Sequence, residues 1–197
     1  MNWDASSFND MIRGFQPACV VFAAAELDLF TLMRGQPFTA ARTAEILRCD
    51  LRAITILLDA LTALSFLQKD GENYAIPSDI EALLSSDRPG NQLSMVRHLA
   101  NCSRRWGKIA QIVKTGTFPP REPSILGAEA DYASFIEAMD NISGSLADGI
   151  ISDISPLTFS RLLDVGGGSG TWALAFLRTR PAAAATIFDL PQVETQA

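Results

Sequence analysis

The stretch from Arg161 to Gly170 constrains the fold of this chain more than any other. Its first half, Arg-Leu-Leu-Asp-Val, is largely apolar and suits a buried parallel strand. A glycine-rich turn, Gly-Gly-Gly-Ser-Gly, follows at once, and residues 171–177 form an apolar helical run. Strand, glycine turn and helix in this order predict a nucleotide-binding crevice, because glycines let a ligand approach the backbone and a helix start offers unpaired N–H groups.

A second strand-like run follows at residues 184–188 and ends at Asp189. An acidic side chain at the end of this strand can accept hydrogen bonds from both ribose hydroxyls of a nucleotide. We therefore predict that Asp189 is a ribose ligand. A surface aspartate that merely ends a strand is the structural alternative.

The spacing of the glycines narrows the choice of ligand. Gly166, Gly168 and Gly170 alternate, whereas a dinucleotide fingerprint opening at Gly166 needs its third glycine where the chain has Thr171. The usual seat of a pyrophosphate is therefore missing, and a phosphate-free nucleoside such as S-adenosylmethionine fits better. Asp164 and the N–H groups of the turn are expected to receive its amine and carboxylate. A dinucleotide site and a purely structural turn are the alternatives.

The composition disfavours several classes of protein. The chain of 197 residues is 48% hydrophobic and 19% charged, which suits a packed core and argues against disorder. A net charge of −6 disfavours nucleic acid and anionic membranes as partners. Cys19, Cys49 and Cys102 are scattered and are interpreted as reduced core thiols of a cytoplasmic protein. We expect no signal peptide, no membrane span and no bound metal.

The first third of the chain is predicted to be helical. Residues 6–14 suit a short helix, and residues 17–33 a second helix with apolar side chains on a shared face. Thr39 and Asp50 can cap the next two helices, because their side-chain oxygens can accept hydrogen bonds from first-turn N–H groups. The later of these helices is expected over residues 51–67, where apolar side chains recur at helical spacing.

A small β hairpin is predicted after these helices. Residues 69–72 form a tight turn and residues 74–76 a strand-like return, which completes a winged-helix pattern. Such a pattern invites comparison with DNA-binding proteins, but the helix at 51–67 carries only Arg52 and Asp59 as charges. DNA recognition needs basic side chains for phosphates and polar side chains for bases. A winged-helix regulator is therefore the remote alternative, and burial of this module against a partner or second copy is favoured.

Two long helices are expected between the hairpin and the glycine turn. They cover residues 91–115 and 131–154, and a proline-bearing loop at 116–123 separates them. We place the domain boundary near the middle of the first helix. Residues 1–105 are predicted to form a helical, winged-helix-like dimerisation domain. Residues 106–197 are predicted to form linker helices and the N-terminal portion of an S-adenosylmethionine-binding α/β domain.

Five segments carry a resemblance to a known family: Ala24 to Phe30, Leu57 to Leu61, Phe135 to Met139, Leu163 to Gly170, and Phe188 to Pro191. With them the chain resembles bacterial S-adenosylmethionine-dependent O-methyltransferases with an N-terminal winged-helix dimerisation domain, whose plant relatives methylate caffeate and flavonoids. The resemblance implies a mostly α domain followed by the first part of a Rossmann-like α/β domain. It also implies methyl transfer to a hydroxyl, a phenol on a small aromatic or polyketide-like metabolite.

The cofactor site is assigned to the glycine turn, the end of the second strand and, by the resemblance, the helix before the sheet. Its members are Asp164, Gly166, Gly167, Gly168, Ser169, Gly170, Asp189, Leu190, Met139 and Ser143. Core packing for Met139 and helix capping or backbone bonding for Ser143 are equally favoured alternatives. Trp106 and Phe135 are candidates for the acceptor pocket, with core packing as their alternative.

The family's catalytic histidine has no counterpart in this chain. The single histidine, His98, lies far upstream in the helical part and is interpreted as a structural or surface residue. Since the resemblance covers only the first part of such a protein, we expect the chain to belong to a longer protein or to need a partner, and to be inactive alone. The resemblance implies a homodimer through the N-terminal helices. A non-catalytic dimerisation or cofactor-binding protein is the alternative function.

Overall fold

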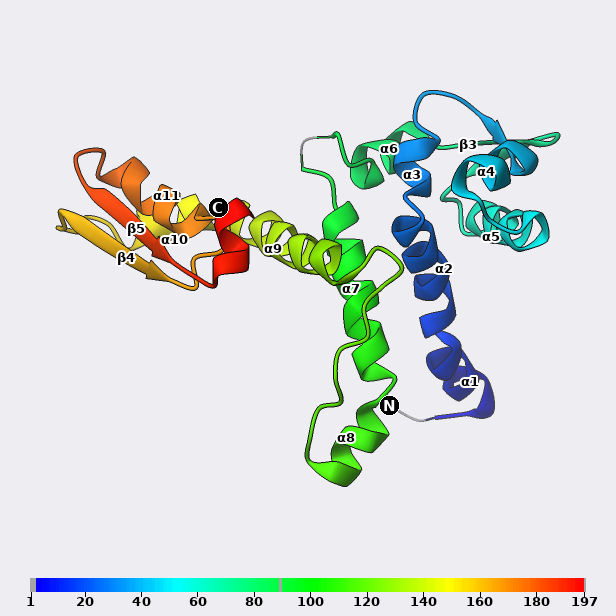
Figure 1. The fold of residues 1–197 in the computed structure, drawn as a ribbon, viewed down its shortest axis with the longest axis horizontal. Helices are drawn as coiled ribbons and strands as arrows, with labels where there is room; N and C mark the ends of the chain where they lie inside the picture. The colour runs from blue at the N-terminus through cyan, green and yellow to red at the C-terminus, as the bar shows by residue number, and fades with distance from the viewer. Residues whose placement is uncertain (1–2, 89, 197) are drawn as a thin grey trace. The chain divides into compact units, whose positions relative to one another are not determined.

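A computed structural model describes residues 3–88 and 90–196 of the chain (Figure 1). The chain divides into two compact units, Met1–Ile125 and Leu126–Ala197. The boundary expected after residue 105 lies within the first unit and stays a prediction. Each unit is described by itself.

The first unit combines helices with a small antiparallel sheet of order β1-β3-β2. Its helices are α1 Ala5–Arg13, α2 Phe15–Glu26, α3 Leu29–Leu32, α4 Ala40–Leu47, α5 Leu51–Ala63, α6 Ser78–Leu84, α7 Leu93–Trp106 and α8 Ile109–Thr115. Its strands are β1 Phe38–Thr39, β2 Gln68–Asp70 and β3 Asn73–Ala75. Helices α4 and α5 followed by the β2–β3 hairpin confirm the winged-helix pattern.

Two predicted helix caps are confirmed. Thr39 Oγ1 accepts a hydrogen bond from the Arg42 N–H at 3.2 Å. Asp50 Oδ1 accepts one from the Ala53 N–H at 2.8 Å. Each bond satisfies a backbone donor that a helix start leaves without an intrahelical partner, so these residues fix where α4 and α5 begin.

The helix predicted over residues 17–33 is wrong as a continuous element, because it is interrupted at Asp28. This residue adopts a left-handed backbone with φ of +54°. Arg97 of α7 explains the break: its Nε donates to the Ala25 carbonyl at 3.0 Å, and its Nη2 to Asp28 Oδ1 at 2.8 Å. The contact spans about seventy positions, and local periodicity does not reveal it.

Two further helices predicted as continuous are also divided. The run at 91–115 separates into α7 and α8 at Gly107–Lys108. The run at 131–154 separates into α9, Ala128–Gly144, and α10, Ala147–Asp153. Glycine or serine stands at both breaks, and these residues favour a helix interior less than alanine does.

The core of the first unit gathers side chains from its helices and its sheet. Its fully buried members include Phe30, Met33, Leu58 and Leu61. Tyr74 of β3 is also buried, and its hydroxyl donates to Asp59 Oδ1 at 2.8 Å. The wing is thus fastened to α5 by both packing and a hydrogen bond.

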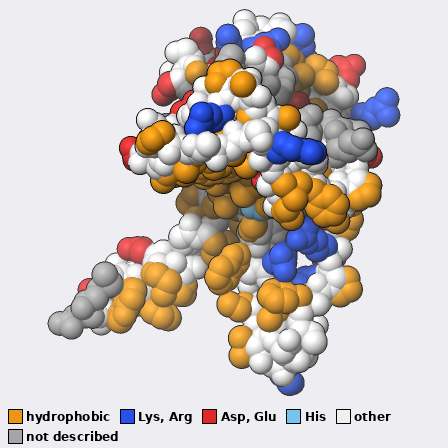
Figure 2. Space-filling view, turned by 90° about the vertical axis from the view of Figure 1, so that its left-hand side faces the viewer, with side chains coloured by type: hydrophobic (Ala, Val, Ile, Leu, Met, Phe, Trp, Pro, Cys, Tyr) orange, Lys and Arg blue, Asp and Glu red, His pale blue; other side chains and the backbone are white. Residues whose placement is uncertain are grey.

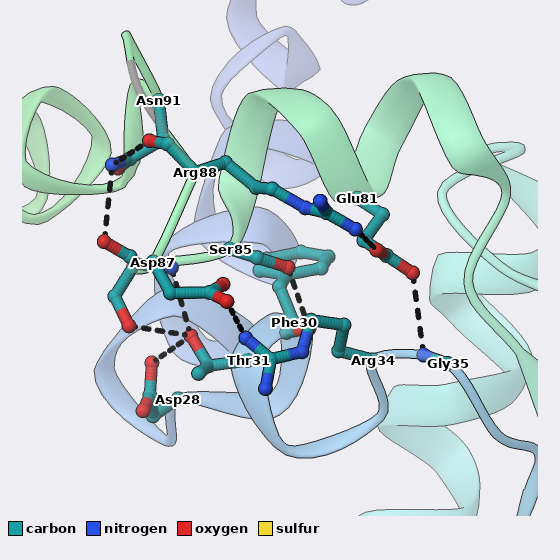
Figure 3. Close-up of polar contacts among 11 residues, drawn as sticks. Asp28, Phe30, Thr31, Arg34, Gly35, Glu81, Ser85, Asp87, Arg88 and Asn91 are labelled. Atoms are coloured by element: carbon teal, nitrogen blue, oxygen red, sulfur yellow. Dashed lines mark hydrogen bonds and ion pairs between the residues drawn. The ribbon is translucent and has the colours of Figure 1, made fainter.

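A polar network fastens α6 and the loop after it to α3 (Figure 3). Ser85 is buried, and its hydroxyl donates to the Phe30 carbonyl at 3.1 Å. Glu81 accepts a hydrogen bond from the Gly35 N–H at 3.3 Å and pairs with Arg88. These bonds connect segments about fifty positions apart and stabilise the packing of α3 against α6.

The second unit contains the predicted strand, glycine turn, helix and strand. After α9 and α10 come β4, Arg161–Val165, then α11, Thr171–Thr179, β5, Ala184–Phe188, and a 3₁₀ helix, η1, at Pro191–Gln196. The two strands are parallel, with Arg161 opposite Ala184 and Val165 opposite Phe188. Helix α11 connects the two strands and contacts both of them, as the crossover helix between two parallel strands does.

The expectation that β4 is buried is wrong for one of its faces. Leu163 and Val165 are 63% and 69% exposed, and Phe188 beside them on β5 is 65% exposed. Because side chains alternate across a strand, α11 covers only the opposite face, which carries Ile187.

Exposed hydrophobic side chains also appear over the surface drawn in Figure 2. Among the described residues, no helix is long and apolar enough to cross a membrane.

Candidate functional site

The glycine turn between β4 and α11 needs glycine for two different reasons. Gly166, Gly168 and Gly170 have φ of +74°, +54° and +79°, a region that other residues adopt only with strain. Gly167 has no such backbone, but a Cβ there would lie 2.8 Å from Asp164 Cγ and 3.0 Å from Ile187 Cγ2. The alternating glycines thus allow the backbone conformation and Gly167 provides space, while Gly170 does both, since a Cβ there would lie 2.7 Å from Ile187 Cδ1.

Asp189 lies against this turn, as its predicted role requires. Its Oδ2 accepts a hydrogen bond from the Gly168 N–H at 2.9 Å, and its Oδ1 one from the Leu190 N–H at 2.7 Å. The Gly166 N–H also donates to the Phe188 carbonyl at 2.7 Å. Each carboxylate oxygen can accept two hydrogen bonds, so Asp189 keeps acceptor capacity for a ligand hydroxyl.

Asp164 presents an unsatisfied acceptor beside the turn. Its Oδ2 is buried and has no hydrogen-bond partner among the described residues. A buried carboxylate oxygen without a donor is destabilising by roughly 1–3 kcal/mol or more. An ammonium group or a bound water would relieve this cost, and the amine of S-adenosylmethionine has the chemistry that this oxygen lacks.

Helix α9 contributes polar groups to the same turn. Asp140 Oδ1 accepts a hydrogen bond from Ser169 Oγ at 3.1 Å and another from the Thr171 hydroxyl. Ser143 Oγ, one turn further along α9, accepts one from Trp172 Nε1 at 3.1 Å. Of the residues expected on this helix, Ser143 therefore contacts α11.

Sequence reasoning missed Asp140, Thr171 and Trp172. One signal was available: Asp140 and Ser143 are three residues apart and share a helix face. It gave no indication that this face meets the glycine turn, because that contact joins segments about thirty positions apart. Met139, which is a predicted member of the cofactor site, is half-buried on α9.

Two family models match the chain, one in each of its parts. Residues 9–77 match the model of the O-methyltransferase dimerisation domain, and residues 124–197 that of the O-methyltransferase domain. The chain belongs to this family of O-methyltransferases. The expected family and fold class are therefore confirmed.

Two relatives of the chain are named as O-methyltransferases. Tetracenomycin polyketide synthesis 8-O-methyl transferase TcmO of Streptomyces glaucescens is 30% identical over 191 residues, 93% of the chain and 56% of TcmO. Human acetylserotonin O-methyltransferase is 27% identical over 202 residues, 94% of the chain and 59% of that enzyme. The chain thus spans less than two thirds of the length of these relatives.

Two solved structures share the fold. PigF with SAH superposes with a TM-score of 0.81 at 26% identity, covering 98% of the chain and 61% of PigF. Human N-acetylserotonin methyltransferase in complex with SAM gives a TM-score of 0.73 at 26% identity, covering 99% and 62%. Both are complexes with the cofactor or its demethylated product.

The two aromatic residues expected at an acceptor pocket belong to different units. Trp106 ends α7 in the first unit and is 69% exposed. Phe135 lies on α9 in the second unit, with its ring 6.3 Å from that of Tyr132. Their role at an acceptor pocket stays a prediction.

His98 lies on α7 in the first unit. Its Nε2 is 3.5 Å from Cys102 Sγ, one helical turn away. Burial, and to a lesser degree the charge of Arg121, lowers the pKa of His98 below its usual value. The expectation of core thiols is met only in part: Cys49 is half-buried and packs against the core of the first unit, Cys102 is half-buried, and Cys19 is exposed. In the part of the chain described here, no group of three or more His, Cys, Asp or Glu could hold a metal ion.

Proposed function

We propose that the protein is an S-adenosylmethionine-dependent methyltransferase that acts on a hydroxyl of a small aromatic or polyketide-like metabolite. One observation carries the proposal: Asp189 contacts the glycine turn at Gly168, beside the unsatisfied oxygen of Asp164. The names of TcmO, linked to a polyketide, and of acetylserotonin O-methyltransferase support the class of acceptor.

Each residue of the site has a proposed task. Asp189 accepts hydrogen bonds from the ribose hydroxyls, and Asp164 from the amine. The glycine turn, formed by Gly166, Gly167, Gly168, Ser169 and Gly170, receives the carboxylate through the N–H groups of Gly167 and Ser169, because those of Gly166, Gly168 and Gly170 donate within the protein. Leu190, Met139 and Ser143 line the site. When bound, S-adenosylmethionine supplies an activated methyl group on a sulfonium. The protein contributes by fixing the position of the reacting groups and excluding water.

The chain of 197 residues is proposed to hold cofactor without turning over on its own. A phenol with a pKa of roughly 10 is mostly protonated at neutral pH and gains from a general base. We assign no residue of this chain to that role, and His98 is not proposed for it. Methylation of a phenol by the purified chain would contradict this part of the proposal.

A homodimer through the N-terminal helices is also proposed. Besides the dimerisation domain, α1 supports it, since none of its residues is buried and Phe8, Met11 and Ile12 are 45–54% exposed along one face. Light scattering at micromolar concentration should show twice the mass of 21.3 kDa. A cytoplasmic location is part of the proposal, and the free thiols suit a reducing compartment.

Asp189→Ala tests the cofactor site directly. We expect its affinity for S-adenosylhomocysteine, measured by calorimetry, to fall about ten- to a hundredfold, because hydrogen bonds to a charged acceptor contribute about 1.5–3 kcal/mol each. Asp153→Ala, an exposed aspartate at the end of α10, is the matched control and should keep the affinity of the unmodified chain. An unchanged affinity in Asp189→Ala would refute the assignment.

A further inference from the structure

Asp140 lies outside the residues that the proposed function uses, yet it contacts the glycine turn. Its Oδ1 accepts hydrogen bonds from the hydroxyls of Ser169 and Thr171, which lie 2.8 Å from each other. Ser169 belongs to the turn itself, and Thr171 is the first residue of α11. One carboxylate on α9 is thus bonded to both the turn and the helix that follows it.

The composition of the turn makes this contact consequential. Between positions 166 and 170, Ser169 is the only residue with a side chain beyond hydrogen. Glycines lose the most backbone entropy on ordering, so a turn of four glycines needs the contacts of its remaining side chain in addition to its backbone hydrogen bonds. The hydroxyl of Ser169 is therefore the side-chain group through which a neighbouring element can fix the turn.

The negative charge of Asp140 is also favourable at the start of α11. Helix α11 begins at Thr171, and the start of a helix carries a partial positive charge from its unpaired N–H groups. A carboxylate bonded to the first residue is favourable there. The Trp172–Ser143 bond joins the same two helices one position later and aligns α9 with α11.

We propose that Asp140 is a positioning residue that fixes the glycine turn in its folded conformation before the cofactor binds. The inference rests on the proposed function, since it assigns Asp140 a part in forming the same site. A turn ordered in advance loses less entropy on binding, so the contact increases cofactor affinity without touching the cofactor.

Amide hydrogen exchange, followed by NMR without cofactor, tests the positioning role. The Gly168 and Gly170 N–H groups donate to Asp189 and to the Gly167 carbonyl, so their exchange reports whether the turn is formed. In Asp140→Ala both should exchange about three- to tenfold faster, as expected for losing exposed hydrogen bonds. Asp140→Asn keeps an acceptor oxygen at the same place and should restore the slow exchange.

Two further variants control for general destabilisation. Asp148→Ala removes the exposed ion pair between α10 and Arg178 at the far end of α11, and should leave exchange at the turn unchanged. If Asp140→Ala fails to fold, the double variant Ser169→Ala, Thr171→Val removes the donors instead, and it should accelerate the same amides. Slow exchange at the turn in either Asp140→Ala or the double variant would overturn the inference.

Calorimetry with S-adenosylhomocysteine separates this inference from the proposed function. We expect Asp140→Ala to bind about tenfold more weakly and Asp140→Asn to bind like the unmodified chain. If the unmodified chain does not bind S-adenosylhomocysteine, the proposed function fails for this chain, while exchange still decides the role of Asp140. If binding and exchange are both unaffected in Asp140→Ala, the inference fails and the proposed function stands.

Discussion

The two units bury their apolar side chains to very different extents. In the first, Phe30, Leu58 and Leu61 are fully buried among side chains from several helices and the wing. In the second, the buried cluster comprises Ala147, Ile151 and Ala175, with Trp172 and Phe176 packed against it. An apolar pattern therefore has different consequences in the two units: it builds a core in the first and an exposed face in the second.

The layers of each unit explain this difference. An apolar face stabilises a fold only when another layer covers it. Helices and the small sheet surround one centre in the first unit, whereas α11 covers a single face of the β4–β5 pair. The other face carries Leu163, Val165 and Phe188, which remain mostly exposed. Exposed apolar strands with unpaired edges invite association.

Matched leucine truncations should give the largest effect and sharpen the comparison. Leu58→Ala in the first unit is expected to lower the free energy of unfolding by about 2–5 kcal/mol, because it leaves a cavity in a packed core. Leu163→Ala on the open face of β4 should change it by less than about 0.5 kcal/mol. Urea denaturation followed by circular dichroism measures both. Equal losses would mean that the face of β4 is covered in solution.

The sequence predicted elements that depend on local chemistry. Thr39 and Asp50 cap the helices expected from them, and the alternating glycines form the turn after β4. Asp189 meets the turn because the ends of adjacent parallel strands lie at one edge of a sheet. In each case the residue type and its neighbours in the chain carry the necessary information.

Features that depend on distant contacts could not be predicted. The break at Asp28 is stabilised by Arg97, and the bonds of Asp140 come from a turn about thirty positions later. Neither partner is marked by periodicity or by a motif. The exposure of Leu163 was missed because an apolar strand suggests burial whether or not a second layer covers it.

Glycine substitutions should give an intermediate effect and compare the units at positions with similar backbones. Gly170→Ala introduces a Cβ at φ of +79° and 2.7 Å from Ile187 Cδ1, so the side chain of Ile187 must move. We expect a loss of about 1–3 kcal/mol, expressed as faster amide exchange in the second unit. Gly71→Ala in the hairpin of the first unit has φ of +57° and open space around it. It should cost only about 1 kcal/mol, and an equal loss at both positions would show that Ile187 does not restrict the turn.

The smallest effect is expected from acid, which should lower the stability of the first unit by protonating Glu81 in its network with Arg88 and Gly35. The Arg88 side chain and the Gly35 N–H lower the pKa of Glu81 from 4.5. A carboxyl group with a lowered pKa in the folded state adds stability above its unfolded pKa and loses it as pH falls through the folded value. The unfolding temperature of the first unit should therefore decline between about pH 5 and pH 3 less steeply in Glu81→Gln than in the unmodified chain. Arg88→Met should flatten the decline as well, since it removes the main cause of the shift. A decline as steep as that of the unmodified chain in both variants would place the acid sensitivity outside the contact between α3 and α6.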